Sequence, residues 1–512
     1  MMASAVPAAE NDGHTARTRL RAVLGVIGIT AAALAARLAT LPRAPDVPDS
    51  VVFVRGVIRF SVTETRPYWP GYPVCMWAGK IVDVVVKDPV LALHLVSALS
   101  SVLVAWPLAW VARAWASSLS MSPSPARAGW AAVALWLVTP MAWVTGSQIF
   151  SDPLGLLFGV CVLALCVAGE RGGAGWWVGA AVLGGLMVGV RLVNVTMLGP
   201  LVWKAWVARW ERWRGFPVPV ALFAGVTAGV APWLGFLLLD APVPALISGG
   251  LEHVGGHFLS WGGSVLTDSH SMARPLRALR NLAVHGLGAG VLGWQWPRIV
   301  ASAAWLTALA AGMAQRPWRG PVARQVGLWA VPHLAYVFLG HDVSYPRYML
   351  SAVALLCVIG GLAASGNRRV GLVAVAIATT ATAVVSAPIA VAQKQQPPVD
   401  YRVARFLARQ PRAAVLVTNA PSLLLYLQDE APGTAFVVAP AREAERWRRE
   451  WEAEGRRVFT TAPPEDNSGD WRPAAHFCRD PLIDPRLGYD AWLFAPVSTP
   501  APYPAPDCYT AE

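Results

Sequence analysis

The sequence predicts a polytopic α-helical membrane protein of about eleven transmembrane helices that ends in a small α/β domain. Hydrophobic residues make up 55% of the 512 residues and charged residues only 14%, and the mean hydropathy is +0.45. A soluble core could not hide so much apolar surface. Apolar runs of about 20 residues, long enough to cross the hydrocarbon core, recur as far as residue 391. We therefore divide the chain into a membrane region, residues 1–397, and a C-terminal domain, residues 398–512.

The positive charge of the chain points to a lipid bilayer rather than to nucleic acid. The formal net charge is +12, which in a soluble protein would favour a nucleic-acid partner. Here most Lys and Arg residues fall in short clusters between apolar runs, as is typical of cytoplasmic loops. We expect a multi-pass protein of the cell (inner) membrane with no nucleic-acid partner.

The first apolar run, residues 23–41, is interpreted as a retained membrane helix. Arg17, Arg19 and Arg21 precede it, and no convincing small-residue cleavage site follows it. Because positive residues favour the cytoplasmic side, we expect the N-terminus in the cytoplasm and the first helix to run outward.

Ten further spans give an alternating topology with two long external loops, residues 42–88 and 240–297. Each predicted internal loop carries at least one arginine, which agrees with this alternation. Seven spans lie near residues 89–111, 129–147, 152–170, 176–190, 195–208, 217–239 and 298–314. The next runs to Gly340, the one after it ends at Arg368 and Arg369, and the last lies near residues 370–391. The last span delivers the C-terminal domain to the extracytoplasmic side.

The C-terminal domain alternates predicted strands with predicted helices, which indicates a small α/β domain with some parallel pairing. It has no catalytic motif, so we interpret it as a lid or docking domain. Outside the cytoplasm, Cys478 and Cys508 could form a disulfide. The predicted helices are 401–410, 422–428 and 441–455, and the predicted strands are 413–418, 435–439, 457–460 and 491–494.

The first external loop gathers carboxylates, arginines and aromatic residues. Asp49 precedes Ser-Val-Val-Phe53, where it could cap a short helix or act as a base toward an acceptor hydroxyl. Glu64 shares the loop. Prolines stiffen the stretch from Pro67 to Pro73, and its aromatic residues could form an interfacial belt or a platform for sugar rings.

Three short motifs resemble one family of membrane enzymes. Asp49-Ser-Val-Val-Phe53 followed by Trp69-Pro-Gly-Tyr-Pro is similar to the first external loop of GT-C-type glycosyltransferases that use polyprenyl-phosphate sugars. Protein mannosyltransferases and aminoarabinose transferases are such families. Tyr345-Pro-Arg-Tyr resembles their Arg-Tyr motif at the start of a late helix, and Gly189-Val-Arg resembles their glycine-arginine element.

The resemblance implies a mechanism as well as a GT-C-like fold. A base on the first external loop activates an acceptor, which attacks the anomeric carbon of a polyprenyl-phosphate sugar and inverts it. The resemblance implies no cofactor, and no metal ion if arginines neutralise the phosphate. On this basis the predicted catalytic residues are Asp49 and Asp152, and the predicted substrate-binding residues are Glu64, Tyr68, Trp69, Tyr72, Arg191, His253, His257, Arg347 and Tyr348.

Several of these residues have alternative interpretations. Asp152 could simply cap its helix, and Arg191 and Arg347 could reach lipid headgroups instead of a donor phosphate. His253 and His257 have metal-ligand spacing, but without a third ligand we favour a sugar or phosphate contact in a loop that closes over substrate. The alternative is a membrane-lying loop, which would also suit the basic face from Arg274 to Arg280.

Two other classes of function remain open. A transporter or flippase of lipid-linked saccharides would also need arginines and aromatic residues, but we would expect internal repeats and polar residues at mid-membrane. A polysaccharide ligase or polymerase, or a non-catalytic assembly subunit, is the further alternative. The sequence does not identify the sugar, the lipid or the acceptor, which could be a lipid, a glycan or a protein.

Overall fold

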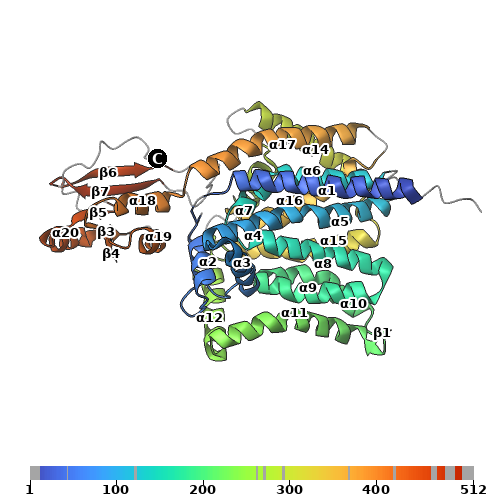
Figure 1. The fold of residues 1–512 in the computed structure, drawn as a ribbon, viewed down its shortest axis with the longest axis horizontal. Coiled ribbons are helices and arrows are strands. Elements are labelled where there is room, and N and C mark those ends of the chain that lie inside the picture. Colours follow the sequence, from blue (N-terminus) through green and yellow to red (C-terminus); the bar gives the residue numbers. More distant parts are fainter. Residues whose placement is uncertain are drawn as a thin grey trace, which may run out of the picture.

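The protein is a bundle of long helices with a β-sheet unit at one end (Figure 1). The computed structural model describes residues 12–42, 44–45, 47–119, 124–260, 263–268, 273–290, 295–366, 369–418, 422–462, 470–478 and 490–498. The helices of the bundle are α1 (Asp12–Ala39), α4 (Pro89–Leu103), α5 (Ala105–Ser117), α6 (Pro125–Val138), α7 (Pro140–Ser147), α8 (Asp152–Gly172), α9 (Ala174–Val190), α10 (Gly199–Val207), α11 (Val218–Asp240), α14 (Trp296–Met313), α15 (Pro321–Gly340), α16 (Leu350–Ala363) and α17 (Arg369–Gln395).

The bundle contains several helices suited to a membrane. Among the described residues, five helical segments are long and apolar enough to cross a bilayer, or six if the bent pair α6 and α7 forms one span. Three shorter apolar helices accompany them. A polytopic membrane fold agrees with this, whereas the predicted number of eleven spans is not established.

Helix breaks explain why the spans are harder to count in the structure than in the sequence. Pro140 cannot donate a backbone hydrogen bond, and α6 and α7 meet there at 57°. Likewise α9 ends at Val190, and the 3₁₀ helix η1 (Leu192–Leu198) precedes α10. Two apolar runs of the sequence are therefore bent or interrupted.

The two predicted external loops contain helices of their own. The first contains α2 (Pro48–Ile58) and α3 (Pro73–Val86). The second contains α12 (Val243–Gly255), the π-helix η2 (Gly256–Ser260), α13 (Arg274–Arg280) and the π-helix η4 (Asn281–Gly286). Figure 1 shows α2, α3 and α12 at the end of the bundle that faces the sheet unit. The hairpin of β1 (Arg212–Trp213) and β2 (Phe216–Pro217) lies at the other end.

Two glycines bring α9 and α11 into close contact. A Cβ on Gly185 would lie 2.2 Å from the carbonyl oxygen of Val226, and one on Gly229 would lie 2.1 Å from the carbonyl oxygen of Val182. Small residues allow such backbone approach between membrane helices. The indole of Trp233 also donates to the Gly185 carbonyl oxygen at 2.9 Å. This packing fixes the end of α9, where Arg191 lies.

The described residues of the C-terminal segment form a five-stranded mixed sheet in the order β4-β3-β5-β7-β6. Strand β3 pairs in parallel with β4 and β5, while β7 pairs antiparallel with β5 and β6. The elements are α18 (Val399–Ala408), β3 (Ala413–Val417), α19 (Leu423–Glu430), β4 (Ala435–Val438), η7 (Ala441–Glu443), α20 (Ala444–Ala453), β5 (Arg457–Thr460), β6 (Trp471–Phe477) and β7 (Ala491–Pro496).

Strand β6 is absent from the sequence prediction. It includes Pro473, and its pairing with β7 shifts register between Pro473 and Ala475. Proline removes a backbone donor and is tolerated in edge strands, and β6 is at the edge of the sheet. The proline therefore obscures the strand in the sequence without preventing it in the structure.

Candidate active site

Asp49 projects from the first turn of α2 and forms an ion pair with a distant arginine. The helix is capped by Val47 and not by Asp49, and Pro48 occupies its first position. The capping role considered for Asp49 is therefore wrong. Its carboxylate, 41% exposed, accepts a hydrogen bond from Nη2 of Arg347 at 2.8 Å.

Arg347 belongs to the 3₁₀ helix η6 (Pro346–Met349), which leads into α16. Its guanidinium carbon lies 4.3 Å from the ring centroid of Phe150, 5.4 Å from that of Tyr345 and 5.2 Å from that of Tyr348. Stacking of a guanidinium on aromatic rings fixes its plane while leaving N–H groups at its edge. Of these, Nε is buried and has no hydrogen-bond partner.

Asp152 and Arg191 form a second, more buried pair. Nη1 of Arg191 donates to Oδ1 of Asp152, and the two side chains are only 13% and 11% exposed. Ser151, not Asp152, occupies the N-cap position of α8 and makes no side-chain capping bond, so the capping alternative is wrong here too. The Arg191 guanidinium carbon also lies 5.1 Å from the ring centroid of Tyr348. Tyr348 is thus in contact with both arginines.

The aromatic rings of the loop from Pro67 to Pro73 contact α12 and α2. Trp69 donates from Nε1 to the carbonyl oxygen of Leu246 on α12 at 3.1 Å, and its ring is 5.4 Å from that of His253. The ring of Tyr72 packs 4.9 Å from that of Phe53 on α2. The loop therefore ties α2, α3 and α12 together rather than forming an isolated belt.

A row of rings continues from Trp69 to Tyr348. The ring centroids of His253 and His257 are 6.4 Å apart, those of His257 and His341 5.2 Å, and those of His341 and Tyr348 4.2 Å. Burial lowers the pKa of all three histidines, and nearby Arg191 lowers the pKa further. At neutral pH the imidazoles are therefore uncharged, and they present stacking faces and hydrogen-bonding atoms rather than positive charge.

These side chains surround one cavity of about 870 Å³. Its volume lies within the range of small-molecule sites, about 300–1,000 Å³. Nine of the eleven predicted site residues contribute to its wall. The predicted residues that line it are Asp49, Tyr68, Trp69, Tyr72, Arg191, His253, His257, Arg347 and Tyr348.

Two predicted residues do not line this cavity. Glu64 is at the surface, where it pairs with Arg59 at 3.0 Å and with Arg66 at 3.5 Å. Asp152 lines a separate small cavity of about 30 Å³, which shares Arg191, His341, Arg347 and Tyr348 with the large one. Asp152 therefore lies behind Arg191, where it can hold the guanidinium in place.

Sequence reasoning did not select several lining residues. Among them are Glu252, which precedes His253 on α12, Tyr336 on α15, and His341 and Tyr345. Tyr345 begins the motif that contains Arg347, and His341 precedes it by four residues in the sequence, a signal that could have identified both. Tyr336 lies within an apolar helix and carries no comparable signal.

Arg274 has a structural role instead of facing lipid headgroups. Its side chain is buried, and it donates to the carbonyl oxygens of Phe338, Gly263 and His341 and to Asp268. Arg277 also pairs with Asp268. The membrane-surface alternative for the basic face of α13 is wrong at Arg274, whose buried side chain holds the second external loop against the end of α15.

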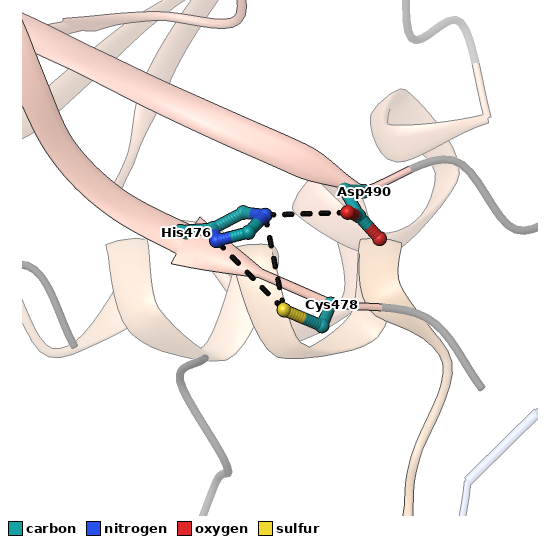
Figure 2. Close-up of side chains that lie close together, drawn as sticks. All are labelled: His476, Cys478 and Asp490. Carbon is teal, nitrogen blue, oxygen red and sulfur yellow. Dashed lines mark hydrogen bonds and ion pairs between the residues drawn. The ribbon is translucent and has the colours of Figure 1, made fainter. Parts of the chain in front are cut away.

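No metal centre emerges among the described residues. The spacing of His253 and His257 is not completed by a third ligand. His476, Cys478 and Asp490 lie together at the edge of the sheet (Figure 2). However, Cys478 is disulfide-bonded, so it has no thiolate to offer a cation. Cys508, its predicted partner, lies outside the described residues.

Comparison with solved structures identifies the fold. ArnT from Cupriavidus metallidurans in the apo state superposes with a TM-score of 0.56 at 15% identity, over 93% of this chain and 98% of ArnT. This chain has the fold of ArnT. ArnT bound to undecaprenyl phosphate gives a TM-score of 0.56 at 14% identity, over 92% of this chain and 98% of ArnT. ArnT is an aminoarabinose transferase with the GT-C fold, so the predicted GT-C-like fold is confirmed.

Other comparisons are weaker. An oligosaccharyltransferase from Archaeoglobus fulgidus, in complex with Zn and sulfate, gives a TM-score of 0.44 at 12% identity, over 91% of this chain and 72% of the other. No family model and no curated protein matches the sequence. Beyond its fold, what this chain shares with ArnT must be argued from its own residues.

Proposed function

We propose that this chain is a membrane glycosyltransferase that moves a sugar from a polyprenyl-phosphate donor to an acceptor at the extracytoplasmic face. One observation carries the proposal. A single cavity brings a solvent-accessible carboxylate, Asp49, together with two guanidinium groups, Arg191 and Arg347, that both contact Tyr348. The ArnT fold supports it, since ArnT has been crystallised with undecaprenyl phosphate.

The two arginines suit the phosphate of the donor. A guanidinium matches a phosphate with paired N–H donors and stays charged at any physiological pH. Both side chains are largely shielded from water, which strengthens their attraction to an anion. They would hold the donor phosphate and stabilise the charge that develops on it when the glycosidic bond breaks.

Asp49 suits the role of general base. It takes the proton of the acceptor nucleophile as that atom bonds to the anomeric carbon, and the bond from this carbon to the phosphate oxygen breaks with its electron pair. Polyprenyl phosphate leaves, and the single displacement inverts the anomeric carbon. Because guanidiniums neutralise the leaving group, we expect transfer to continue in EDTA, and a loss that Mg²⁺ or Mn²⁺ restores would contradict this.

The aromatic row provides a surface for the sugar and the acceptor. Sugar rings present C–H faces that pack against Tyr68, Trp69 and Tyr72, while the neutral rings of His253 and His257 can exchange hydrogen bonds with hydroxyl groups. The sugar, its ring size and the acceptor class remain open in this proposal.

The proposal is tested with purified protein in lipid nanodiscs and a panel of polyprenyl-phosphate sugars labelled in the sugar. We expect release of free polyprenyl phosphate, with transfer of label when cell-envelope extract is added. A protein that carries the labelled lipid across vesicle membranes without breaking the glycosidic bond would be a flippase, and the proposal would be wrong.

The predicted sidedness has its own test. We place the N-terminus in the cytoplasm and the cavity and C-terminal unit outside. A reporter fused after Asp400 should then be active only outside the cytoplasm. A cytoplasmic signal would contradict the proposed location of the reaction.

A further inference from the structure

The C-terminal sheet unit packs against α2, the helix that carries Asp49. Val51 on α2 is only 2% exposed and belongs to the apolar core of the C-terminal unit, together with Leu423, Tyr426 and Leu427 of α19. A residue of the first external loop thus completes the core of a unit that begins about 350 positions later. The contact is therefore part of how both segments fold.

One helical turn after Val51, Arg55 reinforces this contact. Its Nε and Nη2 donate to the two carboxylate oxygens of Asp429 at 3.1 and 2.8 Å, and Nη2 also donates to the carbonyl oxygen of Leu425 at 3.1 Å. Two-point binding of this kind fixes orientation as well as distance. Asp429 lies in the last turn of α19, where the helix dipole favours a cation.

A third contact holds the segment before α2. The hydroxyl of Tyr426, whose side chain is almost fully buried, donates to the carbonyl oxygen of Pro45 at 3.2 Å. On the opposite side, Ser50 donates to the carbonyl oxygen of Ile149 at 3.1 Å. Helix α2 is therefore held between the membrane bundle and the sheet unit.

Asp49 itself has little to fix its position. Its carboxylate is 41% exposed, and its hydrogen bond to Arg347 would compete with any bound phosphate. The orientation of α2 must then determine where the carboxylate lies. The bundle buries one side of α2, including Phe53. The sheet unit contacts Val51 and Arg55, which occupy one face of the helix because they are four residues apart.

We propose that the C-terminal unit braces α2 and so positions Asp49, with Arg55 and Asp429 as positioning residues. The inference rests on the proposed function for its catalytic meaning, and gives the C-terminal unit a role in the reaction without contact to substrate. Since a displacement of about 1 Å can cost about a hundredfold in rate, a loosened brace should lower kcat. The donor KM should change little, because Arg191 and Arg347 lie on other elements.

Charge reversal in the full-length protein tests the brace. We expect R55E and D429R each to lower kcat about tenfold or more with the donor KM within about twofold, and R55E/D429R to return within about threefold of wild type. The control is R446E, which breaks the exposed pair of Arg446 and Glu450 within α20. Single variants no slower than R446E, or a double variant no better than the singles, would overturn the proposal.

Hydrogen exchange gives a readout that needs no activity. In R55Q, a milder change that removes the charge without reversing it, peptides covering residues 48–58 should exchange faster than in wild type. Equal exchange rates in R55Q and wild type would contradict the proposal that the C-terminal unit holds α2 in place. If wild type itself transfers no sugar, the proposed function fails, whereas hydrogen exchange still decides whether the sheet unit holds α2.

Discussion

Asp49 and Arg347, 298 positions apart in the chain, join in an ion pair of 2.8 Å in the wall of the large cavity. The pair connects the one proposed base with one of the two proposed phosphate ligands. A donor phosphate that binds Arg347 would compete with the carboxylate and release it toward the acceptor. The same contact that keeps the arginine in place without donor can thus prepare the base once donor is bound.

Replacing Asp49 with Asn should abolish transfer while leaving donor binding intact. The amide has nearly the same shape but cannot take a proton, and loss of a general base lowers rates about 10²- to 10⁴-fold. Because the amide competes less with phosphate for Arg347, the donor KM should stay equal or fall. Initial rates at varied donor concentration would measure both quantities.

Glu64→Gln is the matched control for that variant. Glu64 is in the same external loop, but it pairs with Arg59 and Arg66 outside the cavity. We expect rates within about twofold of wild type, since exposed ion pairs contribute about 0–1 kcal/mol. Equal losses in Asp49→Asn and Glu64→Gln would show that the loop, and not the carboxylate of Asp49, matters.

Asp152→Asn should act first on stability. It removes the counter-charge of Arg191 while that guanidinium stays largely buried, and breaking a buried pair costs about 3–5 kcal/mol. Thermal unfolding in detergent should therefore shift clearly downward relative to Glu64→Gln. An unchanged unfolding temperature together with lost transfer would instead favour the catalytic role predicted for Asp152.

The membrane fold and most of the cavity could be predicted because their signals are local. Hydropathy predicts the apolar helices, and the prolines between Pro67 and Pro73 indicate a rigid turn from a stretch of only a few residues. The pairing of Asp152 with Arg191 and the burial of Arg274 arise from contacts between separate elements. No pattern in one sequence specifies such contacts, so the sequence predicts Asp152 as a catalytic residue or a cap and Arg274 as part of a basic surface.

The histidine row predicts that acid destabilises the folded protein. The pKa of His253, His257 and His341 lies below its usual value, about 6.5, because of burial. As the pH falls through this value, the unfolded chain takes up protons that the folded protein does not, so the free energy of unfolding decreases. Well above a pH of about 6.5, these histidines are neutral in both states, so they should not make the free energy of unfolding depend on pH.

His341→Asn tests this pH effect most directly, because His341 is the most buried of the three. Unfolding temperatures between pH 5 and pH 8 should fall less steeply toward acid in the variant than in wild type. Parallel curves would show that other groups cause the acid sensitivity.

Arg347→Lys should weaken the donor interaction more than it slows the chemical step. Lysine keeps the charge, but it cannot stack on Phe150 and Tyr345 or present the paired N–H groups of a guanidinium. Loss of one charge-assisted hydrogen bond costs about 1.5–3 kcal/mol, which corresponds to a rise in donor KM of about tenfold to about a hundredfold. Arg59→Lys, at an exposed position outside the cavity, should leave the donor KM unchanged. An equal donor KM in Arg347→Lys and wild type would remove Arg347 from the phosphate site and leave Arg191 as its principal cation.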